Sequence, residues 1–163
     1  ETKTNPLIDR RSFIKTSTAN TGGIAINPIA KMTRAYDFNQ TLKLALIGCG
    51  GRGTGAAVQI LNTPYPVKLI AMADAFQDQL DKSYQNLINK HGKEKVAIPE
   101  KNKFTGFDGY KHAIRLADVV ILATPPGFRP LHFEEAVNQG KHVFVEKPVA
   151  TDVPGAKRIL AAG

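Results

Sequence analysis

Three glycines that follow a short apolar run have the residue types and spacing of a phosphate-binding turn. Gly48, Gly50 and Gly53 fit the pattern G-x-G-x-x-G directly after the apolar run 42–47, and residues with helical spacing follow. The first glycine of such a turn permits a tight bend, the second lets the backbone approach a pyrophosphate, and the third lets the helix pack closely on the strand. The helix then directs its free N–H groups at the phosphates. The predicted turn also includes the residues between the glycines, Cys49, Gly51 and Arg52.

A carboxylate at the end of the next apolar run strengthens this interpretation. Residues 67–73 form a second candidate strand that ends at Asp74. A carboxylate there can accept hydrogen bonds from both ribose hydroxyls of an adenosine, and it would repel a 2′-phosphate. The glycines alone would fit a flexible loop equally well, but with Asp74 they predict NAD binding, with NADP less favoured. The alternative for Asp74 is a helix N-cap before Ala75, and one residue can do both.

A lysine near the end of the chain has the chemistry to exchange a proton beside such a cofactor. The apolar run 142–145 ends in Glu146, Lys147 and Pro148. Desolvation at a strand tip enables a lysine to give or take a proton, or to orient a substrate hydroxyl while a hydride moves. The alternative is an exposed lysine paired with Glu146.

Two further candidate positions follow the apolar run 118–123. Thr124 and Pro125 would border the nicotinamide side of a cofactor groove, or they would form an ordinary turn that ends a strand. His132 lies in the first turns of the next candidate helix and is a candidate substrate contact. A lone histidine is, however, more often a capping or packing residue.

These residues require strands that end at one common edge and helices that cover both faces of the sheet. Apolar runs predict strands at 42–47, 67–73, 118–123 and 142–145, and residues 103–105 are a candidate short strand. Helical periodicity predicts helices after residue 53 and at 77–91, 110–116, 129–139 and beyond 152. This alternation predicts a doubly wound parallel sheet, an α/β fold of the Rossmann type, over residues 40–163. Ligands of such sheets bind beyond the carboxyl ends of the strands. The polar, lysine-rich segment 92–102 is expected to be a solvated surface loop.

The segments 48–53, 123–125 and 140–148 together resemble the Gfo/Idh/MocA oxidoreductases, and the Glu-Lys-Pro triplet after Gly-Lys-His-Val is the most specific part. The resemblance covers residues 42–163. It implies that an N-terminal domain binds NAD or NADP, that Lys147 lies by the nicotinamide and contacts substrate, and that the Thr124-Pro125 turn lines the cofactor. It further implies that the substrate is a sugar, an inositol or a related polyol.

The same resemblance implies a second, larger α/β domain that supplies most of the substrate pocket and mediates oligomerisation. This chain stops at Gly163. We therefore expect this chain alone to bind cofactor without turnover, and a homo-oligomer to form through the missing domain.

Two alternative functions remain open from the sequence. With an export leader, the chain also looks like the NAD-dependent glycosidases of glycoside hydrolase family 109. Those enzymes keep NAD bound, oxidise a sugar transiently, eliminate the aglycone, add water and reduce the sugar again. The other alternative is a nucleotide-binding module without catalysis.

The first 36 residues resemble a twin-arginine export signal. Arg10 and Arg11 are followed by Ser-Phe-Ile-Lys and then by a mildly apolar stretch that ends near Ala30 or Ala35. The match is imperfect, since Asp9 stands where serine or threonine is usual. Residues 1–36 are thus expected to be a leader that directs the folded, cofactor-loaded protein to the periplasm. If they are only a disordered basic tail, a cytoplasmic protein is expected.

The composition argues against several other classes of protein. The 163 residues carry a formal net charge of +8, but six basic and two acidic residues lie in 1–36, so half of that charge belongs to the leader. The sequence has no basic stripe with interleaved aromatic residues, which is the pattern that would predict nucleic-acid binding. No apolar run is long enough to span a membrane. Cys49 is the only cysteine, which excludes an intrachain disulfide. The sequence has no metal-ligand spacing of His, Asp or Glu.

Overall fold

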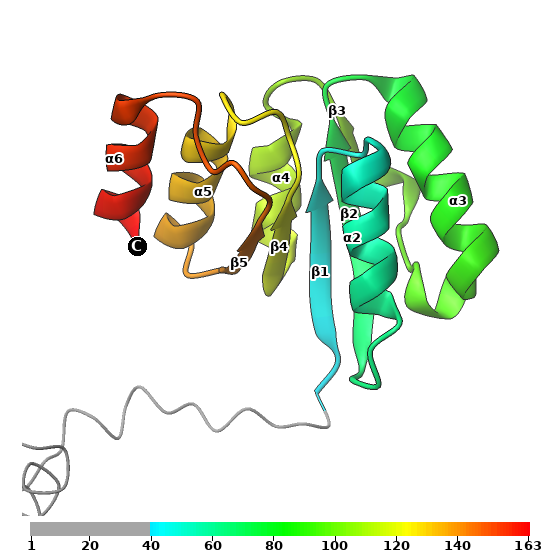
Figure 1. Ribbon diagram of the computed structural model, residues 1–163. Helices are drawn as coiled ribbons and strands as arrows, with labels where there is room; N and C mark the ends of the chain where they lie inside the picture. The colour runs from blue at the N-terminus through cyan, green and yellow to red at the C-terminus, as the bar shows by residue number, and fades with distance from the viewer. Residues whose placement is uncertain (1–39) are drawn as a thin grey trace, which may run out of the picture. The chain divides into compact units, whose positions relative to one another are not determined.

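The computed structural model describes residues 40–163 as one parallel sheet between two layers of helices (Figure 1). The strands are β1 (Leu42–Ile47), β2 (Val67–Asp74), β3 (Lys103–Thr105), β4 (Val119–Leu122) and β5 (His142–Val145), and they lie in the order β3-β2-β1-β4-β5. The helices are α2 (Gly51–Leu61), α3 (Gln77–Lys95), α4 (Gly109–Leu116), α5 (Arg129–Asn138) and α6 (Val153–Ala162), with a 3₁₀ turn at Glu100–Asn102. The predicted doubly wound α/β fold is confirmed. The predicted leader lies outside the described residues.

Side chains of β1 alternate between two cores, one on each face of the sheet. Leu44 and Leu46 are buried on the side that α2 and α3 cover. Ala45 and Ile47 are buried on the opposite side, against α4 and α5. Because both faces of this central strand are covered, its residues 44–47 are all apolar rather than alternating with polar ones.

The parallel register places the ends of three strands at one edge of the sheet. Ile47 lies opposite Ala73 of β2 and opposite Leu122 of β4. The residues that follow these strands therefore meet at the carboxyl edge, which is the upper edge in Figure 1. A hydrogen bond from the Gly48 N–H to the Ala73 carbonyl oxygen (2.9 Å) holds the first two of them together.

The expectation of a simple surface loop at 92–102 is wrong in part. Helix α3 continues to Lys95 through a kink at Gly92, whose φ of 72° lies in the left-handed region. Val96 and Ile98 are then buried in the core beside α2 and α3. The charged side chains at 93, 94, 100 and 101 are exposed, as the sequence predicts for this segment.

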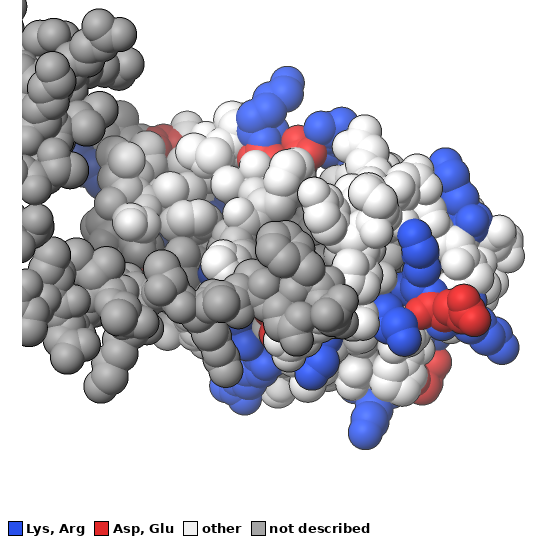
Figure 2. Space-filling view, turned by 90° about the horizontal axis from the view of Figure 1, so that it is seen from below, with Lys and Arg blue, Asp and Glu red and all other residues white. Residues whose placement is uncertain are grey.

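The last helix packs on α5 rather than on the sheet (Figure 1). Asp152 is its N-cap, and its side chain accepts a hydrogen bond from the Gly155 N–H at 2.8 Å. Within residues 40–163, none of the helices has the length and apolar content needed to cross a bilayer. Figure 2 shows Lys and Arg side chains spread over the visible part of one face, with acidic side chains among them, rather than gathered in a single patch.

Candidate cofactor-binding site

A cleft of about 720 Å³ opens at the carboxyl edge of the sheet. Its walls come from the ends of β1 and β2, the turn after β3 and the turn between β4 and α5. This volume lies in the range of small-molecule and cofactor sites. Six of the residues predicted from the sequence line the cleft: Gly48, Gly50, Asp74, Thr124, Pro125 and His132.

The glycine turn is built by close backbone contacts that exclude side chains at two positions. Gly48 has a φ of +92°, and a Cβ there would lie 2.6 Å from the Thr124 nitrogen. A Cβ on Gly53 would lie 1.9 Å from the Gly48 carbonyl oxygen, so α2 can pack this closely on β1 only with glycine. At Gly50, by contrast, a Cβ would meet no neighbouring atom within 4 Å, and the backbone faces open space. This is the shape that a pyrophosphate requires.

The N-terminal end of α2 presents its backbone donors without competition from side chains. Gly50 is the N-cap and supplies no side-chain cap, and the first turn contains no acidic residue. The first N–H groups of the helix therefore keep their positive partial charge for a ligand. These residues fit the diphosphate of a dinucleotide.

Asp74 is fixed in the cleft wall by two backbone donors. Its Oδ2 accepts a hydrogen bond from the Cys49 N–H at 2.6 Å, and its Oδ1 accepts one from the Phe76 N–H at 3.0 Å. Phe76, not Asp74, is the N-cap of α3, so the alternative of a helix-capping role for Asp74 is not found. Each carboxylate oxygen keeps a further lone pair for a ribose hydroxyl. Burial raises the pKa of the Cys49 thiol, which lies beneath the turn and points at the Ala73 carbonyl oxygen.

His132 is buried beside Thr124 at the other end of the cleft. Its Nδ1 lies 3.2 Å from the Thr124 hydroxyl, and its ring packs on Tyr110 with centroids 4.1 Å apart. Burial lowers the pKa of His132 to about 4, so the ring is neutral near pH 7. His132 therefore packs in the protein interior, which was the alternative to a substrate contact, and it also forms part of the cleft wall.

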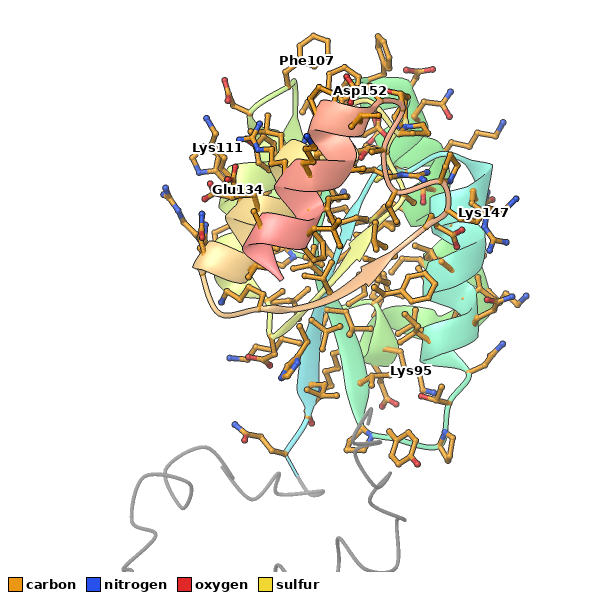
Figure 3. All side chains as sticks on the ribbon, turned by 60° about the vertical axis from the view of Figure 1, so that its left-hand side comes forward. Lys95, Phe107, Lys111, Glu134, Lys147 and Asp152 are labelled. Atoms are coloured by element: carbon orange, nitrogen blue, oxygen red, sulfur yellow. The ribbon has the colours of Figure 1, made fainter. Side chains whose placement is uncertain are left out.

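The Glu-Lys-Pro turn lies beside the N-terminal end of α2, where Figure 3 shows Lys147 on the loop after β5. Glu146 is buried, and its Oε1 lies 2.8 Å from Nη2 of Arg52. This contact holds the pKa of Glu146 below its ordinary value although burial acts in the opposite direction. Within residues 40–163, Glu146 thus pairs with Arg52 and not with Lys147. Lys147 and Pro148 are exposed, and neither lines the cleft.

Arg129 belongs to the site but was not expected from the sequence, which marked it only as the start of a helix. It lines the cleft and is 5% exposed. Its guanidinium donates hydrogen bonds to the carbonyl oxygens of Thr124, Glu146 and Pro148. An arginine at the beginning of a helix, where acidic residues are favoured, was the available signal.

Exposed aromatic side chains at the rim of the cleft were also missed. Phe76, Phe107 and Phe128 follow β2, β3 and β4, and all three line the cleft. Phe107 is 71% exposed and stacks on Phe128 with centroids 5.9 Å apart. Figure 3 shows it at the carboxyl edge, at the opposite end of the domain from Lys95. Flat apolar surfaces here suit the stacking of a planar ring.

A protein-family model agrees with this geometry. The model described as "Oxidoreductase family, NAD-binding Rossmann fold", the Gfo/Idh/MocA model, matches residues 42–162.

Solved structures with the same fold include several dehydrogenases. The myo-inositol 2-dehydrogenase of Lactobacillus plantarum is 27% identical, with a TM-score of 0.60 over 76% of this chain and 33% of that one. The scyllo-inositol dehydrogenase of Lactobacillus casei, solved with bound NAD(H) and scyllo-inositol, is 26% identical, with a TM-score of 0.56 over 76% of this chain and 33% of that one.

The curated relatives that match the chain are named as glycosyl hydrolases rather than as dehydrogenases. A glycosyl hydrolase family 109 protein of Saccharopolyspora erythraea is 27% identical, over 94% of this chain and 36% of its own length. A second one, from Shewanella sp. strain ANA-3, is 28% identical over 87% of this chain and 34% of its own length. The chain therefore spans about a third of the length of the relatives that it matches.

Proposed function

The chain belongs to the Gfo/Idh/MocA oxidoreductase family, and we propose that it is the cofactor-binding part of an NAD-dependent oxidoreductase. The substrate of the whole enzyme would be a sugar, an inositol or a related polyol, as in the inositol dehydrogenases that share its fold. The observation that carries this proposal is the Asp74 carboxylate, held by two backbone N–H groups in the wall of a cleft that begins at the uncapped α2.

Each part of the site has a distinct task in this proposal. The N–H groups of the 48–53 turn would bind the pyrophosphate, and Asp74 would bind the adenosine ribose and disfavour a 2′-phosphate. Thr124 and Pro125 would border the nicotinamide. When bound, NAD supplies the acceptor for a hydride from a substrate carbon. Lys147 would orient the hydroxyl on that carbon and take its proton as the C–H bond breaks.

The exposure of Lys147 fits a site that is completed by a further part of the enzyme. Residues 40–163 alone do not exclude water from this side chain. A substrate domain above the carboxyl edge would remove that water and supply most of the contacts to the polyol. We also propose that such a domain mediates homo-oligomer formation.

The test is to measure cofactor binding and hydride transfer in the natural protein that contains this chain. The protein is titrated with NAD and NADP, and NADH formation is then followed with myo-inositol and scyllo-inositol as probe substrates. We expect NAD to bind more tightly than NADP. We also expect Lys147→Ala to keep NAD binding and lose most turnover, while the exposed Lys157→Ala on α6 behaves as the unmodified protein does. Absence of NAD binding would refute the proposal.

A second candidate function, an NAD-retaining glycosidase, is favoured by the curated relatives. Glycosyl hydrolase family 109 proteins are 27% and 28% identical over 94% and 87% of the chain. A dehydrogenase releases NADH during turnover, and such a glycosidase does not. Cleavage of an aryl glycoside without accumulation of free NADH would favour the glycosidase.

The third possibility, a module that binds a nucleotide without catalysis, makes a different prediction about size. The intact mass of the protein purified from its source decides it. A mass two to three times that of this chain is expected for an enzyme with a substrate domain, whereas a mass near 17.7 kDa would favour the module.

We further propose that the twin-arginine motif directs export, which places the enzyme in the periplasm.

A further inference from the structure

Arg129 is a buried cation in a place where helix electrostatics disfavour positive charge. It is the first residue of α5 and is 5% exposed. The N-terminal end of a helix stabilises anions rather than cations, and burial of a guanidinium costs free energy unless its N–H groups find partners. Arg129 has such partners, but they lie outside its own helix, so it is expected to serve the site rather than the local stability of α5.

The partners of Arg129 all belong to the two turns that border the predicted nicotinamide position. Nε donates a hydrogen bond to the Thr124 carbonyl oxygen at 2.6 Å. Nη1 donates to the Glu146 carbonyl oxygen at 2.6 Å and also to the Pro148 carbonyl oxygen. The last two acceptors are the residues directly before and after Lys147. One guanidinium therefore binds the backbone on both sides of the lysine and ties it to the turn after β4.

We propose that Arg129 is a positioning residue, which holds the backbone of Lys147 at a fixed place relative to the Thr124-Pro125 turn and the cofactor cleft. The functional half of this inference rests on the proposed role of Lys147 in hydride transfer. The ordering of the 146–148 turn by Arg129 does not depend on that role.

The geometry requires the guanidinium and not merely a positive charge. Its planar fork presents donors in several fixed directions, and so it reaches carbonyls in two separate turns at once. A lysine ammonium at the same place could keep the charge, but it would have to choose among these acceptors. Arg52 adds a second restraint, because it binds the Glu146 carboxylate while Arg129 binds the Glu146 carbonyl. The residue before Lys147 is thus held through both its side chain and its backbone.

The structural half of the proposal is tested by hydrogen exchange in the natural protein, without ligand. Arg129→Lys and Arg129→Met are compared with the unmodified protein and with Arg158→Met, which removes an exposed arginine that pairs with Glu134 between α6 and α5. In both Arg129 variants we expect the Glu146 amide, which donates to the Leu122 carbonyl oxygen, to exchange about tenfold faster, because the charge-assisted hydrogen bonds that hold this turn are lost. Exchange in β1 and β2 should remain as it was, and the Arg158 variant should resemble the unmodified protein.

The functional half is tested by separating kcat from KM in NAD-linked inositol oxidation. We expect Arg129→Lys to lower kcat by about 100-fold, because a displacement of Lys147 by roughly 1 Å has a cost of this size. The KM for NAD should stay nearly unchanged. A residue that only stabilises the fold would instead lower the melting temperature with kcat intact.

The outcomes separate this inference from the proposed function. Unchanged exchange of the Glu146 amide, or an equal acceleration throughout the sheet, would overturn the positioning role. An unmodified protein that binds no NAD and oxidises no polyol would overturn the proposed function instead, and the exchange measurement would still decide whether Arg129 orders the turn.

Discussion

At the scale of single residues, Asp74 is the side chain on which we expect the choice of cofactor to depend. We expect Asp74→Ala to weaken NAD binding about 10- to 100-fold, because hydrogen bonds to a charged carboxylate are lost. The preference for NAD over NADP should narrow, mainly through the loss of NAD affinity. Isothermal titration with both cofactors measures this. Asp78→Ala, an exposed acid in the first turn of α3, is the matched control, and a selectivity like that of the control would contradict the ribose role.

His132 predicts how the stability of the protein depends on pH. Its pKa is about 4 in the folded protein because of burial, against 6.5 ordinarily. Between about pH 6.5 and pH 4, His132 is therefore protonated in the unfolded chain and neutral in the folded protein. The contribution of the neutral ring is complete above pH 6.5 and declines as the pH falls toward 4, by about 3 kcal/mol at most. Urea unfolding between pH 4 and 7 measures the slope.

Two variants isolate the histidine responsible for this slope. His132→Gln should flatten the pH dependence between about 6.5 and 4. His142→Gln, at an exposed position of β5, should leave it unchanged. A slope that persists in the His132 variant would assign the titration to another group.

The residues that the sequence revealed are those whose role depends on their immediate neighbours along the chain. The glycine spacing and an acid at a strand end can be recognised locally, and the structure places Gly48, Gly50 and Asp74 in one cleft. The partners of Arg129 lie five to nineteen residues away and become neighbours only when β4 and β5 pair. No local pattern specifies these partners, so the contacts could not be predicted, although the unusual place of the arginine at a helix start could have been noticed.

At the scale of elements, the packing of α2 on β1 gives three glycines of similar appearance in the sequence different expected responses to substitution by alanine. Gly53→Ala should destabilise the protein by roughly 1–3 kcal/mol, because its Cβ would collide with the Gly48 carbonyl oxygen. Gly50→Ala should change stability by no more than about 1 kcal/mol and yet weaken NAD binding, since its Cβ would occupy ligand space. Gly55→Ala should stabilise the helix by about 1 kcal/mol, because nothing crowds that position.

Chemical denaturation and NAD titration of the three variants test this order. The Gly55 variant is the control for the effect of alanine in α2. If Gly50→Ala bound NAD as tightly as the Gly55 variant, the pyrophosphate would not pass over the turn as proposed.

The strands and helices were predicted well where apolar runs are continuous, and less well where a helix ends in polar residues. Four of the five strands lie where apolar runs indicated, because a sheet covered on both faces needs such runs, and β3 lies at the candidate short strand 103–105. The regular part of α3 ends at His91, as predicted, because the backbone angles of Gly92 are not helical. The further turn at 93–95 and the burial of Val96 and Ile98 were missed, because Gly92 and the lysines after it are typical of a loop.

At the scale of the whole molecule, the leader hypothesis makes a prediction about location. Replacement of Arg10 and Arg11 by lysine should leave the folded protein in the cytoplasm, because the twin-arginine route recognises the arginine pair. Arg34→Lys, the same chemical change outside the motif, should not alter export. Immunoblots of periplasmic and cytoplasmic fractions measure the distribution. Equal periplasmic amounts of both variants would contradict a twin-arginine signal.

The hydrogen bond between the Cys49 N–H and Asp74 has a consequence for evolution and engineering of this cofactor site. The carboxylate that would select NAD is also a structural support of the turn that would bind the diphosphate. A substitution that makes room for a 2′-phosphate therefore removes an acceptor from the glycine turn at the same moment. Evolution or design that changes the cofactor preference must first provide the Cys49 N–H with a new acceptor. A single substitution at position 74 is therefore not expected to change the cofactor preference without also disturbing the glycine turn.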